Sequence, residues 1–138
     1  MAAVSLQETE AFDLVQQFVH VAVRQRCDSE PYVAKDLDVL RSVLGARTLY
    51  DVGDPPTIVG VVFGPWSVGP CVRLVAAQPP FTPVTVTVDV GTELHSSYVR
   101  AVASGADIAA PPVEQPWGMR EFVLSLANGH RLVVTGPA

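Results

Sequence analysis

Residues 116–134 read PWGMREFVLSLANGHRLVV, and this stretch decides the fold. Two runs rich in β-branched and aromatic residues, 119–124 and 131–134, flank the segment Leu-Ala-Asn-Gly at 126–129. Asn128 and Gly129 are residues that favour turns. The stretch therefore predicts two paired strands, with Trp117 in the turn before them.

The first half of the chain has the pattern of a strand, a helix and three further strands. Residues 18–24 are rich in β-branched residues and predict the first strand. Asp28 or Ser29 is a candidate helix cap, and Gly45 stands where a left-handed residue ends a helix. Apolar side chains recur between them at helical spacing, at Val33, Leu37, Leu40 and Leu44. Strands are predicted at 47–51, 57–63 and 71–76, and a short leading helix at 8–17.

The second half repeats the same order of elements. A strand is predicted at 84–90 and a helix at 92–104, which ends at Gly105. Leu94, Tyr98 and Val102 are expected on the buried face of this helix. Residues 108–113 predict an irregular edge strand, because Pro111 and Pro112 interrupt them. The predicted hairpin follows.

This repetition predicts an α+β fold of two βαβββ modules that form a curved mixed sheet with an open cleft. We expect one domain over residues 1–138, with module one at about 18–77, a proline-rich linker at 78–83 and module two at about 84–137. The curved sheet of a single module leaves its concave face open. Two such sheets side by side make one cleft, which a second subunit often completes. We therefore expect a dimer.

Composition excludes several classes of function. The chain has 138 residues, of which 49% are apolar and 17% charged, and its mean hydropathy is +0.30. No apolar run approaches the ~20 residues that span a bilayer, and the acidic start predicts a cytoplasmic protein. The net charge is −5 and the eight arginines are scattered, so we expect no binding to nucleic acid or membrane. Cys27 and Cys71 lack metal-site spacing and are expected to be reduced thiols.

The closing stretch and the duplicated modules resemble the glyoxalase / bleomycin resistance / extradiol dioxygenase superfamily, which has the vicinal-oxygen-chelate fold. Metal-dependent members hold a divalent ion with His and Glu side chains on cleft-facing strands. His20 matches the first ligand position, but residues 83–85 and 71–76 offer no further ligand, and Val133 stands where the Glu belongs. The resemblance therefore implies a metal-free member, without cofactor or catalytic residue.

The remaining titratable residues suggest no catalytic group. No Ser-His-Asp spacing, nucleophile elbow, phosphate loop or dinucleotide fingerprint is present. We expect His95 on a helix surface and His130 in a turn, both solvated. Glu121 is the one carboxylate in the hairpin strands. If Phe122 faces the cleft with Val133, Glu121 faces the other way.

Aromatic side chains are the best candidates for ligand binding, because stacking favours planar ligands. Two tryptophans in turns need either a ligand or a neighbouring subunit as packing partner. Arginines 24, 73, 120 and 131 are possible donors at the cleft rim, depending on strand register. The predicted ligand-binding residues are Trp66, Trp117, Phe63, Phe122, Tyr50 and His20.

These observations favour non-enzymatic binding and sequestration of an antibiotic or similar aromatic natural product by a homodimer. One alternative is a glyoxalase- or dioxygenase-like lyase or isomerase, which needs an unusual metal site at His20 or acid–base work by Glu121 or His20. A second alternative is an interaction module that docks on a biosynthetic enzyme. It predicts no small-molecule binding.

Overall fold

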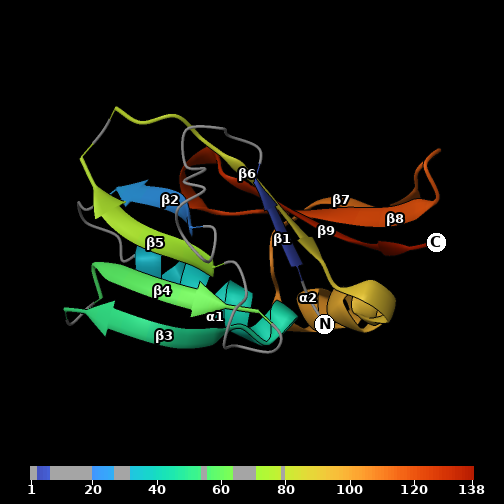
Figure 1. Ribbon diagram of the computed structural model, residues 1–138, viewed down its shortest axis with the longest axis horizontal. Coiled ribbons are helices and arrows are strands. Elements are labelled where there is room, and N and C mark those ends of the chain that lie inside the picture. The colour runs from blue at the N-terminus through green and yellow to red at the C-terminus, as the bar shows by residue number, and fades with distance from the viewer. Residues whose placement is uncertain (1–2, 7–19, 27–31, 54–55, 64–70, 79) are drawn as a thin grey trace.

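A computed structural model of the protein describes residues 3–6, 20–26, 32–53, 56–63, 71–78 and 80–138. Its elements form two modules of the same order (Figure 1). Module one contains β2 (His20–Arg26), α1 (Tyr32–Leu44), β3 (Arg47–Val52), β4 (Ile58–Val62) and β5 (Cys71–Ala77). Module two contains β6 (Thr85–Asp89), the 3-10 turn η1 (Gly91–Glu93), α2 (Leu94–Ser104), β7 (Ile108–Glu114), β8 (Met119–Ser125), the 3-10 turn η2 (Ala127–Gly129) and β9 (Arg131–Pro137).

The two sheets share one strand arrangement, which confirms the predicted α+β fold of two βαβββ modules. Sheet one has the order β2-β5-β4-β3, and sheet two has the order β1-β6-β9-β8-β7. In each module the first strand pairs in parallel with the last, and the other pairs are antiparallel. Sheet two also contains β1 (Ala3–Leu6), antiparallel to β6, which the sequence analysis did not predict.

Helix α1 follows its predicted pattern, and α2 departs from it at one residue. Val33, Leu37 and Leu40 are buried in α1, and Gly45 follows the helix at φ 67°. In α2 the fully buried residues are Leu94, Ser97 and Ala101, whereas Val102 is 55% exposed. The prediction that Val102 lies on the buried face is therefore wrong, because the stripe that meets the sheet runs through positions 94, 97 and 101. The predicted leading helix and the caps at 28–29 lie outside the described residues.

Strand β7 runs through both prolines at the edge of sheet two, as predicted, with two irregularities in its register against β8. Neither α1 nor α2 has the length and apolar composition of a membrane-crossing helix.

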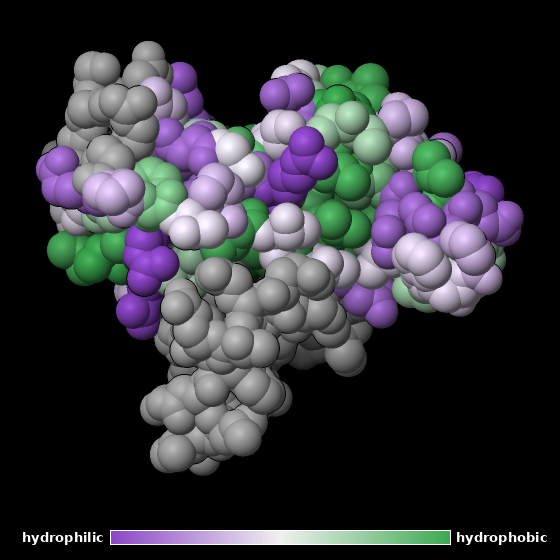
Figure 2. Space-filling view, turned by 90° about the horizontal axis from the view of Figure 1, so that it is seen from above, coloured by the Kyte–Doolittle hydropathy of each residue, from purple (hydrophilic) through white to green (hydrophobic). Residues whose placement is uncertain are grey.

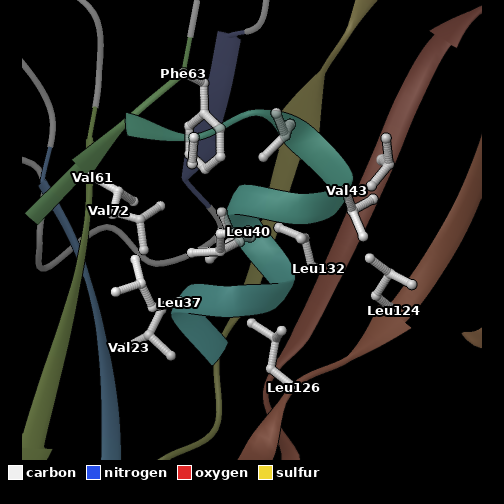
Figure 3. Close-up of a cluster of buried hydrophobic side chains, with 14 of the residues drawn as sticks. Val23, Leu37, Leu40, Val43, Val61, Phe63, Val72, Leu124, Leu126 and Leu132 are labelled. Carbon is white, nitrogen blue, oxygen red and sulfur yellow. The ribbon is translucent and has the colours of Figure 1, made fainter. Parts of the chain in front are cut away.

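Helix α1 lies between the two sheets (Figure 3). Its apolar side chains meet Val23, Val61 and Val72 of sheet one on one side and Leu124 and Leu132 of sheet two on the other, within a single core cluster. The inner faces of both sheets therefore contribute to one core. We call the opposite sides, which look away from this core, outer face one (sheet one) and outer face two (sheet two).

Candidate functional site

A row of paired residues crosses the centre of sheet one. Tyr50 in β3 lies opposite Gly60 in β4, Gly60 lies opposite Arg73 in β5, and Arg73 lies opposite Ala22 in β2. Val61, next to Gly60, is buried in the core. Because side chains alternate along a strand, this row lies on outer face one.

The Tyr50 ring covers Gly60. A Cβ atom on Gly60 would collide with Cε2 and Cζ of that ring, so only glycine leaves room for it. Arg73 Nε donates a hydrogen bond of 2.9 Å to the Tyr50 hydroxyl, and the guanidinium carbon lies 6.0 Å from the ring centroid. Tyr50 remains 37% exposed. The three residues thus form an ordered aromatic and cationic surface, which we call the Tyr50 platform.

The charges on outer face one are basic. Arg24 and Arg47 occupy this face beside Arg73, as the strand pairing and alternation show. Asp51 in β3 lies opposite Val59, which is buried in the core, and therefore belongs to the other side of the sheet. The described strand positions of outer face one carry arginines and no carboxylate. The described strand positions of this face thus carry positive charges in a chain whose net charge is −5.

Outer face two is mixed in character. Figure 2 shows the molecule from above, where apolar surface lies beside hydrophilic side chains over the module-two half on the right. Within the described residues, the hydroxyl of Thr135 is buried without a hydrogen-bond partner. Strand register places the following side chains on this face: Thr85, Thr87, Asp89, Arg131, Val133, Thr135, Glu121, Val123 and Ser125.

Strand parity corrects the predicted positions of two hairpin residues. Phe122 lies opposite Val134, is 0% exposed and packs edge-on against Tyr98 of α2, with ring centroids 5.3 Å apart. Val133 lies opposite Val123 instead. The expectation that Phe122 shares a face with Val133 is therefore wrong, and Glu121 lies on outer face two. Phe122 faces the core because α2 covers that side of β8.

The other predicted ligand-binding residues are widely separated. Phe63 follows β4 and is buried in the core beside α1 (Figure 3). Trp117, in the turn between β7 and β8, is 65% exposed. His20 begins β2 opposite Cys71, but its side chain lies outside the described part, as does Trp66 entirely. The structure therefore brings Tyr50 together with Arg73, and not with Phe63 or Phe122.

His130 is buried, which contradicts its predicted solvated position. It is 1% exposed, its Nδ1 accepts a 2.9 Å hydrogen bond from the Val84 N–H, and its Nε2 lies 2.6 Å from the Arg24 carbonyl. Nε2 must therefore carry the proton and donate it to that carbonyl. Burial lowers the pKa of His130 below its ordinary value of 6.5. His95 is exposed on α2, as predicted.

A chain of buried and partly buried polar groups joins the modules. Asn128 donates to Gln25, and Gln25 donates to Asp36 of α1, whose other carboxylate oxygen accepts from the Ala127 N–H at 3.2 Å. Asn128 has a φ of 61°, which Asn tolerates better than most residues. Burial raises the pKa of Asp36 to about 6, against the lowering effect of the Ala127 N–H. The closing turn is thereby fixed against β2 and α1.

Solved structures of known proteins share this architecture. TioX from Micromonospora sp. ML1 is 22% identical to the chain, and the match covers 86% of the chain and 98% of TioX with a TM-score of 0.64. A glyoxalase/bleomycin resistance protein/dioxygenase from Nocardioides is 16% identical over 86% of the chain and 81% of its own, with a TM-score of 0.60. The chain has the vicinal-oxygen-chelate fold.

The fosfomycin resistance protein FosX from Mesorhizobium loti has the same fold at 13% identity, over 86% of this chain and 88% of FosX, with a TM-score of 0.58. The sequence matches no protein-family model and no curated protein. At these identities the likeness establishes the vicinal-oxygen-chelate fold only. Function has to be argued from the residues of the site.

The described residues do not fit the metal that this fold often holds. The positions where the resemblance implies ligands carry Val133 and Thr85 on outer face two. Across the described part of the chain, no three His, Cys, Asp or Glu side chains gather as a potential ion site. Asp89 and Glu121 lie on separate strands on either side of Thr135, which offers a hydroxyl in place of a strong ligand.

Arg73 and Gly60 are the site residues that sequence reasoning undervalued. Arg73 was predicted only as one of four possible hydrogen-bond donors at the cleft rim. Gly60 was predicted only as part of the strand at 57–63. A signal was present in the sequence, because glycine inside a β-branched run often marks a close approach of another group. The group above Gly60 is the ring of Tyr50, ten residues earlier in the chain. The alternation of side chains along a strand does not identify that partner.

Proposed function

We propose that the protein binds an aromatic small molecule, an antibiotic or similar natural product, and sequesters it without converting it. One observation carries this proposal: the Tyr50 ring, which is 37% exposed, covers Gly60 at the centre of outer face one. The partly buried side chains of Ile58 and Val75 belong to the neighbouring row on the same face. Apolar walls with a few oriented polar groups are typical of small-molecule sites. FosX, which shares the fold, is a fosfomycin resistance protein.

We infer that a second copy of the chain completes the site. Within one chain both inner faces belong to the same core, so the two outer faces look away from each other. A ligand enclosed on both sides therefore needs outer face two of another molecule above outer face one. Opposite charges would meet there, because Arg24 of outer face one would face Asp89 and Glu121 of outer face two, which also carries Arg131. Such a homodimer holds two equivalent sites.

Trp66, Trp117 and His20 stay in the proposal as ligand-binding residues. Trp117 presents an exposed indole in a turn, where it needs a ligand or a second subunit as a partner. Phe63 and Phe122 support the strands from the core side instead of touching the ligand. We expect the protein to act in the cytoplasm.

A glyoxalase-like lyase or isomerase is the second candidate, because Glu121 lies on outer face two and not on the core side. A carboxylate there is available for proton transfer to a bound ligand. Mass spectrometry of ligands recovered after incubation distinguishes the two candidates. Recovery of unchanged ligand supports sequestration, whereas a product that disappears with Glu121→Gln supports the enzyme.

The test is a titration of the purified protein with bleomycin-type, quinoxaline- or quinoline-bearing peptide and mitomycin-type antibiotics, followed by tryptophan fluorescence and calorimetry. We expect saturable quenching in the micromolar range or below for one class. Trp117→Ala should weaken this binding, whereas Val99→Ala, which removes an exposed apolar side chain of α2, should not. A flat response to every class by both methods would contradict the proposal and favour a protein-docking module.

A further inference from the structure

We propose that Asp89, Thr135 and Glu121 form a subsite for an organic cation that carries N–H donors, such as a primary ammonium group on an apolar skeleton. This inference rests on the proposed function and adds the chemistry of the ligand to it. The three residues stand side by side across sheet two, because Thr135 of β9 lies opposite Asp89 of β6 on one side and Glu121 of β8 on the other. We call them the acidic row.

The hydroxyl at the centre of the acidic row has no partner. Thr135 is 6% exposed, and its Oγ1 makes no hydrogen bond to any described part of the chain. A buried polar group without a hydrogen bond costs free energy, so each such group in a folded protein needs a reason. Core packing is not the reason, since strand alternation places Val134 in the core and Thr135 on outer face two. The face proposed for ligand binding therefore holds an unused hydrogen-bonding group.

The carboxylates on either side supply further acceptors. Neighbouring strands lie about 4.8 Å apart, so the Cα atoms of Asp89 and Glu121 are separated by about 10 Å with Thr135 midway. Asp89 Oδ1 accepts a 2.9 Å hydrogen bond from the Gly91 N–H. Among the described residues, Asp89 Oδ2 and the Glu121 carboxylate have no partner. A primary ammonium group has three N–H donors and no acceptor, which matches two carboxylates and a hydroxyl oxygen.

The charges near the acidic row favour a cation. The two carboxylates are partly exposed, and Arg120, which follows Thr135's other neighbour in the pairing with β9, lies on the opposite side of the sheet. Arg131, the described arginine on outer face two, is four residues before Thr135, a distance of about 13 Å along the strand. Charges separated by more than about 8–10 Å are largely screened at physiological ionic strength. The acidic row therefore attracts a positive group.

The backbone beneath the acidic row is held in place. The Val90 N–H donates a 2.9 Å hydrogen bond to the Thr135 carbonyl, and Gly91 fixes the Asp89 carboxylate as described above. At Gly136 strand β9 approaches η1 so closely that a Cβ atom would collide with the Gly91 carbonyl oxygen. Acceptors that are positioned before the ligand arrives lose little order when it binds.

Apolar side chains adjoin the acidic row and set the rest of the ligand's chemistry. Val113 of β7 lies opposite Glu121 and is 50% exposed. The next row on the same face carries Val123 and Val133, both partly exposed. A cation with an apolar or aromatic skeleton could therefore place its charge at the carboxylates and its carbon atoms on these valines.

The first test compares three probes with one ring system: naphthylmethylammonium, its N-trimethylated analogue and naphthylmethanol. Calorimetry or saturation-transfer NMR on the wild-type protein should show the primary ammonium binding about tenfold more tightly than the alcohol, the ratio that a hydrogen bond to a charged group supplies. The trimethylated cation has the charge without N–H donors and should bind more weakly than the primary ammonium. Equal affinity of the primary ammonium for this protein and that of either other probe would overturn the proposal.

Variants of the carboxylates locate the effect. Asp89→Asn and Glu121→Gln keep the shape of each side chain, and Asn still accepts from the Gly91 N–H, so both variants should fold. Each should reduce the preference for the ammonium probe over the alcohol. Glu114→Gln is the matched control, because Glu114 is an exposed carboxylate of the same sheet on its other side. Equal behaviour of these three variants would overturn the subsite.

The Thr135 hydroxyl has a test of its own. Thr135→Val should weaken the ammonium probe about threefold without lowering the free energy of unfolding, since it removes a buried hydroxyl that has no partner. Thr135→Ser keeps the hydroxyl and should keep the preference. Thr85→Val makes the same change on outer face two, two rows away, and should leave the preference unaltered. A Thr135→Val protein that is less stable and binds the probe like the wild type would overturn the role of this hydroxyl.

The outcomes separate this inference from the proposed function. Antibiotic binding by a wild type that shows no preference for the ammonium probe would leave sequestration standing and overturn the subsite. A wild type that binds neither the antibiotics nor the naphthyl probes would overturn both. Arg24 of a second copy is the competing partner for these carboxylates, so sedimentation of Asp89→Asn and Glu121→Gln is a further check. A weakened dimer with an unchanged probe preference would assign the acidic row to the interface and overturn the subsite.

Discussion

His130 shows how a single residue can join two modules. Its ring accepts from the Val84 N–H and donates to the Arg24 carbonyl, two backbone groups that belong to different modules. Leaving both groups without a partner in a buried position is costly. His130→Ala should lower the free energy of unfolding by about 3 kcal/mol at pH 7.5, measured by urea denaturation. If the free energy of unfolding does not change beyond experimental error, water or neighbouring groups replace the hydrogen bonds of the imidazole ring.

The same residue predicts an acid effect. The lowered pKa of His130 means that the unfolded chain binds its proton more readily than the folded chain does. The contribution of His130 is therefore present above its ordinary pKa of 6.5 and declines as the pH falls below that value. The stability difference between wild type and His130→Ala should shrink in this range.

Gly60 is predicted to resist substitution because the Tyr50 ring lies above it. Gly60→Ala should destabilise the protein by about 2 kcal/mol, since the new methyl group displaces the ring from a packed position. In a Tyr50→Ala background the same change should have no cost or a small benefit, because alanine suits a strand better than glycine. Additive effects in this double-mutant cycle, followed by urea denaturation, would show that the ring does not occupy this space.

At the scale of the element, β8 illustrates why alternation alone is ambiguous. The sequence predicts a strand whose successive side chains face opposite sides, but not which side the helix covers. The structure assigns Phe122 to the core and Val123 to outer face two. Phe122→Ala should therefore lower the free energy of unfolding by 3–5 kcal/mol, and Val123→Ala by roughly 1 kcal/mol. Similar losses for both in chemical denaturation would contradict this assignment.

The elements β2, α1 and η2 meet at Asp36, whose carboxylate is buried and hydrogen-bonded. Its pKa is raised from 3.8 to about 6, so the folded state binds the proton more readily than the unfolded state. Stability from this group is present below pH 3.8 and is lost as the pH rises through about 6.

Relative to Asp36→Asn, the wild type should therefore lose up to roughly 3 kcal/mol between pH 4 and pH 7, as measured by urea unfolding. His130 is present in both proteins, so its opposite pH effect largely cancels in this difference. A constant difference across the range would show that the hydrogen bonds to the carboxylate offset its burial.

At the scale of the whole molecule, the arrangement of the outer faces predicts a dimer. Sedimentation equilibrium should give twice the mass of the chain at micromolar concentration. Because the proposed contact brings Arg24 of outer face one near Asp89 and Glu121 of outer face two, added salt should weaken it. Charge reversal at Arg24 and Arg47 should dissociate the dimer, and reversal of Asp89 and Glu121 should restore it in a mixture of the two variants. A monomer at all concentrations would contradict the two-chain site.

Most of the fold follows from local patterns. The duplicated order of elements, the helix ends at Gly45 and Gly105 and the proline-bearing edge strand were all predicted, because each depends on neighbours within a few residues. The candidate site was predicted only in part. Tyr50 was among the expected ligand-binding residues and lies on the platform, whereas Phe63 and Phe122 occupy the core.

The sequence by itself determined which segments become strands and helices, because periodicity and turn residues act locally. The tertiary structure decided which face of each strand is buried, since that depends on the helix that covers it. It also decided that His130 is buried and hydrogen-bonds the Arg24 carbonyl, 106 residues away in the chain. In the same way, it placed Arg73 against Tyr50, 23 residues away, beside Gly60. The His130 contact arises from packing the two modules together and the Arg73 contact from strand pairing within module one, and no local pattern encodes either.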